Sequence, residues 1–437
     1  MEAAALQRVV AEWLRGPALP ELTPRELPLP RLEPPRPILA IAGPRRSGKT
    51  FYLFQLIERL LGSGKAVRED ILFVDFEDYR LRDFAPEDMD RLLAAFHQLA
   101  GRPPRYLFFD EVHRLPHWSR VLRTLHNARK YALVVTGSNT SMLSSRIASE
   151  LRGRYEDVMV LPFSFREFLA HRRISWDEAM LSTPESGLVL KAFDEYLRWG
   201  GFPEVASSPD EREKKGLLQS YFETTYYRDV IDRCRIRART LLDLLMRNIL
   251  ESYASLFSIS AFGAQLKAGG LAGSKRSIAD YLRFLEEAFF VATLEKFDYS
   301  PRKRMMNPKK VYLTDTGFAV LGGAFSENRG HLLENVVAVE LLRRRAHAGY
   351  FKGEGECDFI IQKGTRPAEA WQVCWELGPR NEKRELKGLS EAMSVLGLKM
   401  PLILTYLQEG TRRVNGEQAR VMPVWRWLLE SPSRSRR

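Results

Sequence analysis

The sequence has 437 residues, with 67 lysines and arginines against 55 aspartates and glutamates, for a formal net charge of +12. At roughly 100–200 residues per domain, this length predicts two to four domains. Hydrophobic residues make up 45% of the chain and aromatic residues 11%, which excludes a largely disordered protein. No run of about 18 apolar residues occurs, and the first residues lack a secretion signal. Three scattered cysteines exclude a disulfide framework, so we expect a cytoplasmic protein.

The positive charge is concentrated in the second half of the chain. Residues 1–220 contribute +2, residues 221–330 contribute +5 and residues 331–437 contribute +5. A basic excess favours polyanionic partners such as nucleic acid, because it raises their local concentration. The alternative is a charge that only keeps the protein soluble.

The first part of the chain alternates short apolar strands with helices, after an N-terminal helix and a proline-rich tether that together span residues 1–36. Strands that are apolar throughout are typical of a parallel sheet covered on both faces. The expected strands lie at residues 38–42, 71–74, 106–109, 133–136 and 158–161. This pattern predicts an α/β domain over residues 37–162.

The rest of the chain changes pattern twice. Residues 163–220 are mainly helical, and residues 221–330 are helical before ending in two strand-like runs around a basic turn. Residues 331–437 form a second α/β pattern, with a helix at 331–345 and strands near 357–362 and 369–375. We therefore expect three further domains with these boundaries.

A glycine-rich loop lies directly between the first strand and the first helix of the α/β domain. Residues 43–50 fit the pattern G-x-x-x-x-G-K-S/T without a mismatch. Such glycines let backbone amides curl around phosphates, and the helix N-terminus adds its positive dipole. Lys49 would reach the β- and γ-phosphates, and the Thr50 hydroxyl would hold Mg²⁺. The residues predicted to contact a nucleotide here are Gly43, Pro44, Arg45, Arg46, Ser47, Gly48, Lys49 and Thr50.

Two further strands end in polar residues that suit the same site. The strand at 106–109 is followed by Asp110, which would bind Mg²⁺ through water, and by Glu111, which would orient or deprotonate the attacking water. The strand at 133–136 is followed by Ser138 and Asn139, either of which could contact the γ-phosphate or that water. The alternative for Ser138 and Asn139 is an ordinary loop cap.

These three motifs resemble the AAA+ superfamily, in the additional-glutamate class of P-loop ATPases. The resemblance implies ATP and Mg²⁺ as ligands, ATP hydrolysis, and a sheet in the order 5-1-4-3-2. The segment around Arg152 and Arg154 resembles the place where AAA+ proteins carry an arginine finger, with Arg154 the stronger candidate. A finger acts on the neighbouring subunit's nucleotide, which implies a head-to-tail dimer or a ring, a hexamer among the candidates. The alternative is that these arginines pair with nearby acids.

Residues 161–169 and 196–204 are similar to a large family of bacterial and archaeal ATPases, and the similarity covers roughly residues 36–410. The run Gly200-Gly201-Phe-Pro203 resembles the lid motif of signal-transduction-type ATPases, which would place Pro203 near the adenine. Members of the family carry a helical lid, a winged helix and a C-terminal nuclease-like domain. The resemblance assigns these to residues 163–220, 221–330 and 331–437.

Independently of the family, residues 241–313 have the order of a winged helix-turn-helix. Ser274 is expected to cap a third helix, whose apolar face would leave three cations free to meet DNA. Two strands would then flank a basic wing tip that contacts the phosphate backbone. The alternative is a module that only packs against the lid or binds protein. The predicted DNA-binding residues are Lys275, Arg276, Arg283, Arg302, Lys303, Arg304, Lys309 and Lys310.

The C-terminal pattern resembles the restriction-endonuclease-like fold with a PD-(D/E)xK site. Glu334 lies on a helix, Asp358 on a strand, and alternation on the next strand would put Gln372 and Cys374 on one face beside Asp358. In active members two acids hold Mg²⁺ and a lysine assists the water. Here Cys374 occupies the lysine position and Gln372 the second acid position, so we expect an inactive site that serves in DNA binding or subunit organisation. The alternative for Cys374 is an inert buried thiol.

Together these features favour an ATP-driven, oligomeric DNA motor or remodeller, with branched DNA among its candidate substrates. Two alternatives remain. One is a nucleotide-dependent regulatory or defence switch that binds protein partners. The other is an active metal-dependent nuclease.

Overall fold

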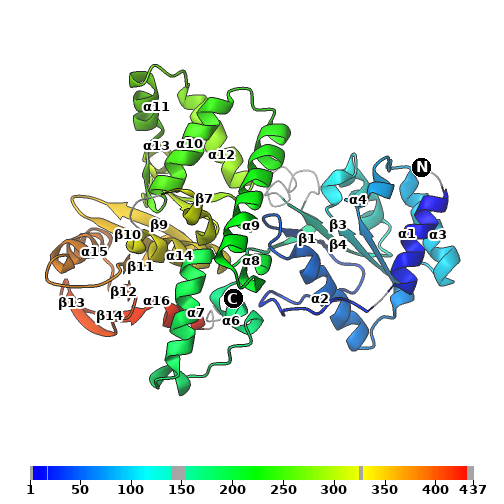
Figure 1. Cartoon of the computed structure of the whole chain (residues 1–437), viewed down its shortest axis with the longest axis horizontal. Coiled ribbons are helices and arrows are strands. Elements are labelled where there is room, and N and C mark those ends of the chain that lie inside the picture. The colour runs from blue at the N-terminus through cyan, green and yellow to red at the C-terminus, as the bar shows by residue number, and fades with distance from the viewer. Residues whose placement is uncertain (1–2, 17, 139–152, 324–327, 431–437) are drawn as a thin grey trace. The chain divides into compact units, whose positions relative to one another are not determined.

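The computed structural model describes residues 3–16, 18–138, 153–323 and 328–430. The chain divides into two compact units, Met1–Leu161 and Pro162–Arg437, coloured blue to cyan and green to red in Figure 1. Within the described residues, no helix combines the length and the apolar character needed to cross a membrane.

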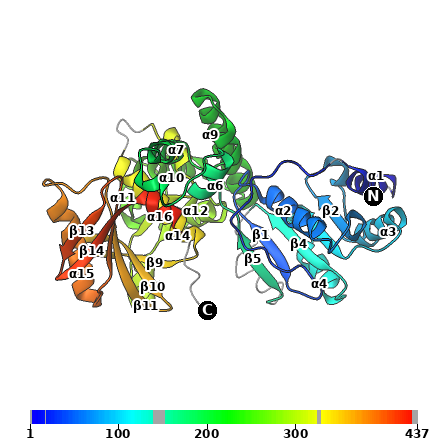
Figure 2. The same ribbon diagram turned by 90° about the horizontal axis from the view of Figure 1, so that it is seen from below.

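A five-stranded parallel sheet forms the centre of the first unit (Figures 1 and 2). Its strands lie in the order β2-β3-β4-β1-β5, which confirms the predicted order 5-1-4-3-2. The bounds are β1 Ile38–Ala42, β2 Ile71–Asp75, β3 Tyr106–Asp110, β4 Ala132–Gly137 and β5 Tyr155–Met159. Strands β1, β3 and β4 are buried along their whole length, because helices cover both faces of the sheet. Their carboxyl ends lie at one edge, and the loops that follow carry the polar residues predicted from the sequence.

Among the described residues of the first unit, one α-helix precedes the strands and three lie between them. The first is α1 Ala3–Arg15, and the others are α2 Lys49–Gly62, α3 Asp88–Ala100 and α4 Trp118–Asn127. Helix α1 packs against α3 and β2, so the N-terminal helix is part of the unit (Figure 1). Its buried face repeats at helical spacing through Leu6, Val9, Val10 and Trp13.

The second unit begins with helices and a small antiparallel sheet. The helices are α6 Phe165–His171, α7 Ser186–Trp199, α8 Pro203–Ser207, α9 Glu211–Thr224 with its π-helical continuation η6 Thr225–Asp232, α10 Arg239–Ser252, α11 Ile259–Ala268, α12 Lys275–Glu287 and α13 Pro301–Met306. The sheet has the order β6-β8-β7, with β6 Ser255–Phe257, β7 Val291–Leu294 and β8 Lys309–Leu313. Helices α10 to α13 gather together beside β7 (Figure 1). Ser274 accepts from Ser277 N at 3.0 Å and so caps α12, as the sequence predicts.

The second unit ends in a mixed six-stranded sheet with the order β13-β14-β12-β11-β10-β9. The strands are β9 His347–Lys352, β10 Glu356–Lys363, β11 Arg366–Val373, β12 Pro401–Thr405, β13 Gly410–Val414 and β14 Glu417–Pro423. The helices are α14 Arg329–Arg343, α15 Glu382–Leu396 and α16 Val424–Leu429. Helix α15 packs on β9, β10 and β11, whereas α14 and α16 pack on each other and on β11, β12 and β14. The β11–β12 and β12–β14 pairs are parallel and the others antiparallel.

Hydrogen bonds of two side chains, Asn335 and Asp315, hold the end of β8 and the segment that follows it. Asn335 of α14 accepts from Leu313 N at 2.9 Å and donates to Leu313 O at 2.8 Å. Asp315 Oδ2 accepts a hydrogen bond from Gly201 N at 2.8 Å. A Cβ at Gly200 would lie 1.7 Å from Asp315 Oδ1, so a side chain at this position has no room. The Gly-Gly motif thus secures the segment after β8 to the start of α8.

Candidate functional site

The glycine-rich loop of the first unit has the backbone that a phosphate-binding loop requires. Gly43 follows β1, and a Cβ there would lie 2.0 Å from Val160 O, so a side chain has no room. Gly48 has φ of 93° and precedes the first residue of α2. This left-handed conformation costs glycine little and turns the chain into the helix. The loop therefore presents the N-terminus of α2, where backbone amides and the helix dipole attract anions.

The first turn of α2 is joined to the end of β3 by hydroxyl–carboxylate hydrogen bonds. Thr50 Oγ1 donates to Asp110 Oδ2 at 2.6 Å. Thr136, at the end of the neighbouring strand β4, donates its hydroxyl to Asp110 Oδ1. Burial raises the pKa of Asp110 despite these two hydrogen bonds. Hydroxyl and carboxylate oxygens are the ligands that Mg²⁺ prefers, so Thr50 and Asp110 suit this ion.

A second acid lies beside Asp110 on the neighbouring strand. Asp75 ends β2 and pairs in register with Asp110. Burial, together with the charges of Asp110, Glu77 and Glu111, raises the pKa of Asp75 to about 6, although a backbone hydrogen bond from Glu77 opposes the shift. The edge of the sheet therefore carries excess negative charge that a bound cation would relieve.

Glu111 is held between the loop and the strand ends. Its φ of 47° lies in the left-handed region, which is sparsely populated and strained for a residue with a side chain. Its backbone N–H donates to Thr136 Oγ1 at 2.8 Å, while Lys49 Nζ lies 3.5 Å from Oε1 and His113 Nδ1 lies 3.2 Å from Oε2. Burial would raise the pKa of Glu111, but Lys49, His113 and Arg45 outweigh it and lower the pKa to about 2. Glu111 is therefore an ionised carboxylate next to the loop lysine.

The proline-rich segment contributes a residue that sequence reasoning missed. Arg25 is buried and donates to Ser47 O at 2.7 Å and to Leu161 O at 2.6 Å. The Tyr52 hydroxyl donates to Pro28 O in the same segment. These contacts hold the segment against the phosphate loop. A proline-rich composition gives no signal for such packing, because it depends on the tertiary position of the loop.

The structure describes only some of the other residues predicted for this site. Asn139 and Arg152 lie outside the described residues. Ser138 is described and buried at the end of β4. Arg154 is half-buried just before β5, where its carbonyl accepts from Ile38 N at 2.8 Å. Pro203 is the first residue of α8 in the second unit, so its proximity to adenine stays a prediction.

The predicted DNA-binding cations divide into two groups. Lys275 and Arg276 are exposed in the first turn of α12, and Arg302 and Lys303 are exposed in the short helix α13. The others are already engaged or less accessible. Arg283 contacts Asp280 at 3.3 Å and Glu287 at 2.5 Å, Lys309 lies 3.4 Å from Glu295, and Arg304 is half-buried.

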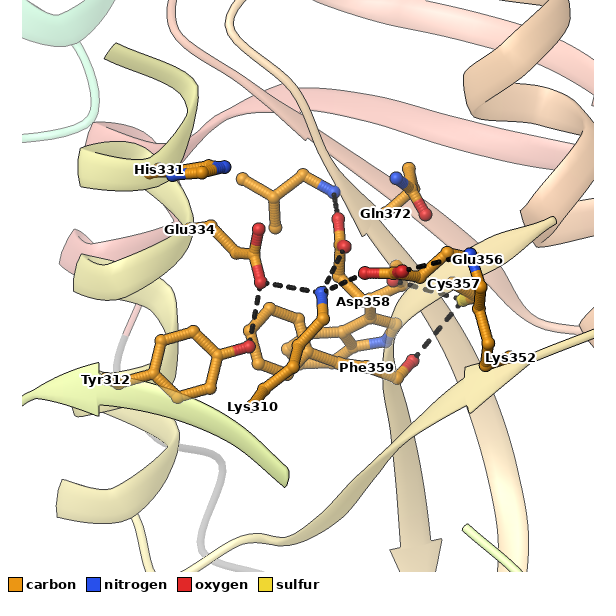
Figure 3. A network of polar contacts seen from close by, with 12 residues as sticks. Lys310, Tyr312, His331, Glu334, Lys352, Glu356, Cys357, Asp358, Phe359 and Gln372 are labelled. Carbon is orange, nitrogen blue, oxygen red and sulfur yellow. Dashed lines mark hydrogen bonds and ion pairs between the residues drawn. The ribbon is translucent and has the colours of Figure 1, made fainter. Parts of the chain in front are cut away.

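The prediction that Lys310 is an exposed cation of the wing tip is wrong. The Lys310 side chain is 1% exposed, and it points from β8 between carboxylates of α14 and β10 (Figure 3). Lys310 Nζ lies 2.9 Å from Glu334 Oε1, 2.8 Å from Glu356 Oε1 and 2.8 Å from Asp358 Oδ1. Alternation along β8 turns Lys309 and Lys310 to opposite faces, and only Lys309 reaches the surface. Lys310 is thus unavailable to phosphates, and Glu356 is a member of the cluster that sequence reasoning missed.

Gln372 and Cys374 do not complete a set of ligands around these acids. Gln372 Nε2 donates to Glu385 Oε2 of α15 at 2.8 Å. Cys374 belongs to the apolar cluster formed with Leu389 and Met393 of the same helix. Burial raises the pKa of Cys374 to about 12, so it is a neutral thiol. In the described part of the chain, no three histidine, cysteine or acidic residues form a group suited to a metal ion.

Comparison with known proteins places this geometry in a family. A family model described as an AAA domain matches residues 35–169, and a model described as a domain of unknown function (DUF8612) matches residues 190–326. The uncharacterized protein MJ1544 of Methanocaldococcus jannaschii is 32% identical over 406 residues, which cover 90% of this chain and 89% of that protein. The chain belongs to the same AAA-domain family as MJ1544.

The chain is also similar to a bacterial protein. An uncharacterized protein of Haemophilus influenzae is 28% identical over 346 residues, covering 79% of this chain and 84% of that protein. Among solved structures, AMPPCP-bound DnaA from Aquifex aeolicus is similar at 13% identity, covering 64% of this chain and 86% of that one, with a TM-score of 0.24. A structural likeness of that size carries no argument about function.

Proposed function

We propose that the first unit binds ATP with Mg²⁺ and hydrolyses it. The observation that carries this proposal is the junction between the loop and β3, where Thr50 bonds Asp110 at 2.6 Å and Lys49 lies 3.5 Å from Glu111. The residues present fit a nucleotide. Ser47 Oγ is buried and has no hydrogen-bond partner within the described residues, so it lies ready for a polar ligand group.

Each residue of the junction has a role in this proposal. Bound ATP and Mg²⁺ would supply the phosphoanhydride bond and the charge that polarises it. Lys49 would hold the phosphates, Thr50 and Asp110 would hold the metal ion, and Glu111 would take a proton from the attacking water. Lys49 is the main cation that lowers the pKa of Glu111. Phosphates that engage Lys49 would weaken this effect, and Glu111 would become a stronger base.

Binding and turnover measurements on two variants test the ATPase proposal. Lys49→Ala should lose nucleotide binding, because the loop then has no cation for the phosphates. Glu111→Gln should bind ATP and hydrolyse it far more slowly. Lys65→Ala is the matched control, since Lys65 forms an exposed ion pair with Glu33. Unchanged ATP affinity in Lys49→Ala would refute the site, and unchanged turnover in Glu111→Gln would remove Glu111 from the base role.

We further propose that the second unit binds DNA through α12 and α13. This proposal is supported by the exposed pairs Lys275 with Arg276 and Arg302 with Lys303, and by the position of the first pair in the first turn of a helix that follows a helix and a turn. Such cations would contact phosphates and give affinity without reading sequence. Coupling DNA binding to ATP hydrolysis would make the protein a motor or remodeller.

Gel shifts with duplex, single-stranded and four-way DNA at several salt concentrations test this proposal. The double variant Lys275→Ala/Arg276→Ala should reduce the slope of log affinity against log salt by about 2, or about 1 for each lost phosphate contact. Lys383→Ala/Lys399→Ala removes two exposed cations elsewhere and is the matched control. Failure to bind any of these DNAs at low salt would refute the proposal.

The mode of action depends on how turnover responds to DNA and to neighbouring subunits. ATPase activity stimulated by DNA would favour a motor, whereas slow turnover with retained ADP and no response to DNA would favour a regulatory switch. If Arg154 acts on a neighbour's nucleotide, Arg154→Ala mixed with Glu111→Gln should regain activity that neither variant has alone. Absence of such recovery would remove Arg154 from a role in trans.

A further inference from the structure

The cluster around Lys310 is saturated by contacts within the chain. A lysine ammonium has three N–H donors, and Lys310 has three carboxylate oxygens within 2.9 Å. The same carboxylates have other partners as well. Tyr312 donates to Glu334 Oε1 at 2.7 Å, and Val373 N donates to Asp358 Oδ2 at 2.9 Å (Figure 3). The ammonium therefore already occupies the centre of the acid cluster.

The members of this cluster come from three separate elements. Lys310 lies on β8 of the small sheet, Glu334 on α14, and Glu356 and Asp358 on β10 of the large sheet. A cation shared by acids from different elements holds those elements together, as a structural metal ion does. Removing the cation would leave carboxylates that repel one another in a site that is most open to water at Glu356, whose side chain is 31% exposed, against 9% for Glu334 and 7% for Asp358.

We propose that the Lys310 ammonium is the permanent cation of this carboxylate cluster, so that it takes the place of a divalent metal ion and the cluster binds neither Mg²⁺ nor Mn²⁺. Coordination of Mg²⁺ needs six oxygens at about 2.0–2.1 Å. The carboxylate oxygens that face the centre of the cluster already accept hydrogen bonds or ion-pair contacts from Lys310 Nζ. A metal ion at this centre would also be repelled by the ammonium. The pKa of Lys310 is raised by Asp358 and Glu334 even though burial opposes the shift, so the ammonium keeps its charge.

Removal of the lysine should therefore create a metal site. Mn²⁺ binding is measured by electron paramagnetic resonance on the nucleotide-free full chain, and the loss caused by Asp358→Asn isolates this cluster from the ATP site. In the wild type, Asp358→Asn should leave Mn²⁺ binding unchanged. Lys310→Met should gain one bound Mn²⁺ per chain, and Lys310→Met/Asp358→Asn should lose it again. Lys310→Arg keeps the charge and should gain none.

Three results would overturn the proposal. One is Mn²⁺ binding by the wild type that Asp358→Asn abolishes, a result that does not depend on how well any lysine variant folds. Another is a folded Lys310→Met protein that gains no Mn²⁺. Cleavage of DNA by the wild type in Mg²⁺ or Mn²⁺, lost in Asp358→Ala, would also contradict it, because that activity needs a metal ion at these acids. The ATPase proposal is unaffected by any of these outcomes.

Discussion

Lys49 of the first unit and Lys310 of the second unit are both buried, and they lie beside carboxylates in different ways. Lys49 is 5% exposed, donates to Pro44 O at 3.0 Å and lies 3.5 Å from its only described carboxylate contact, Glu111. Lys310 is 1% exposed and has three carboxylates at 2.8–2.9 Å. Lys49 thus retains capacity to bind a further anion, whereas Lys310 has none.

The difference shows that a lysine whose N–H donors are all used within the fold has a structural role, whereas a lysine with donors left over can bind a ligand. A lysine with loose contacts at a helix N-terminus can exchange a carboxylate for a phosphate at little cost. When all the N–H donors of a lysine are used in a buried cluster, removing that lysine leaves buried carboxylates without a cation. The two sites therefore respond differently to mutation, the first in turnover and the second in stability.

The largest expected effect is on turnover in the first unit. Glu111→Gln should slow ATP hydrolysis by about 10²–10⁴-fold, the usual contribution of a positioned general base. Steady-state ATPase assays at saturating ATP measure this effect, with Glu58→Gln, an exposed acid of α2, as the control. An equal loss in both variants would show that the effect does not come from the position of Glu111.

The next effect is on the stability of the second unit. Lys310→Met should lower the free energy of unfolding by about 3–5 kcal/mol, because it leaves buried acids without their cation. Lys309→Met on the same strand breaks only a partly exposed contact with Glu295 and should cost about 1 kcal/mol or less. Urea unfolding of both variants measures the difference. Equal costs would show that burial of Lys310 has no energetic consequence.

The smallest expected effect is the pH dependence due to Asp75. Its pKa is raised to about 6, so between about pH 4 and pH 6 the folded protein binds more protons here than the unfolded chain. The free energy of unfolding should therefore fall as pH rises through this window. Because Asp75 is partly exposed, we expect a fall of about 1–2 kcal/mol that Asp75→Asn removes. Urea unfolding of wild type and variant at pH 4, 5, 6 and 7 tests it, and parallel pH profiles would contradict it.

Much of the first unit was predictable because its signals are local. The spacing from Gly43 to Thr50 and the apolar strand before Asp110 predict a loop and a strand end, and the sheet order follows from the family resemblance. The fifth strand begins at Tyr155, three residues earlier than predicted, because its first residues include two acids, Glu156 and Asp157, that are exposed or only partly buried and so give no apolar signal. Arg25 was not predictable, since a proline-rich segment gives no indication of where it packs.

The second unit was harder to predict because its decisive contacts join distant elements. The cap at Ser274 is a local signal and was found. The basic run at Lys309 and Lys310 predicts a wing tip that contacts phosphates, but a strand turns neighbouring side chains to opposite faces. Nothing local to Lys310 indicates that Glu334 and Asp358, which lie 24 and 48 residues further along the chain, surround it.

The sequence by itself determined the parallel sheet, the phosphate loop and the acids that follow β3, because each depends on residues close together in the chain. Only the tertiary structure decided which of two neighbouring lysines is buried, and that Glu356 joins Glu334 and Asp358 around it. The physical reason is that burial and charge pairing depend on which faces of β8, α14 and β10 meet, and that depends on packing across the whole second unit. The same net charge of +12 therefore includes exposed cations on α12 and α13 and a lysine fixed inside the fold.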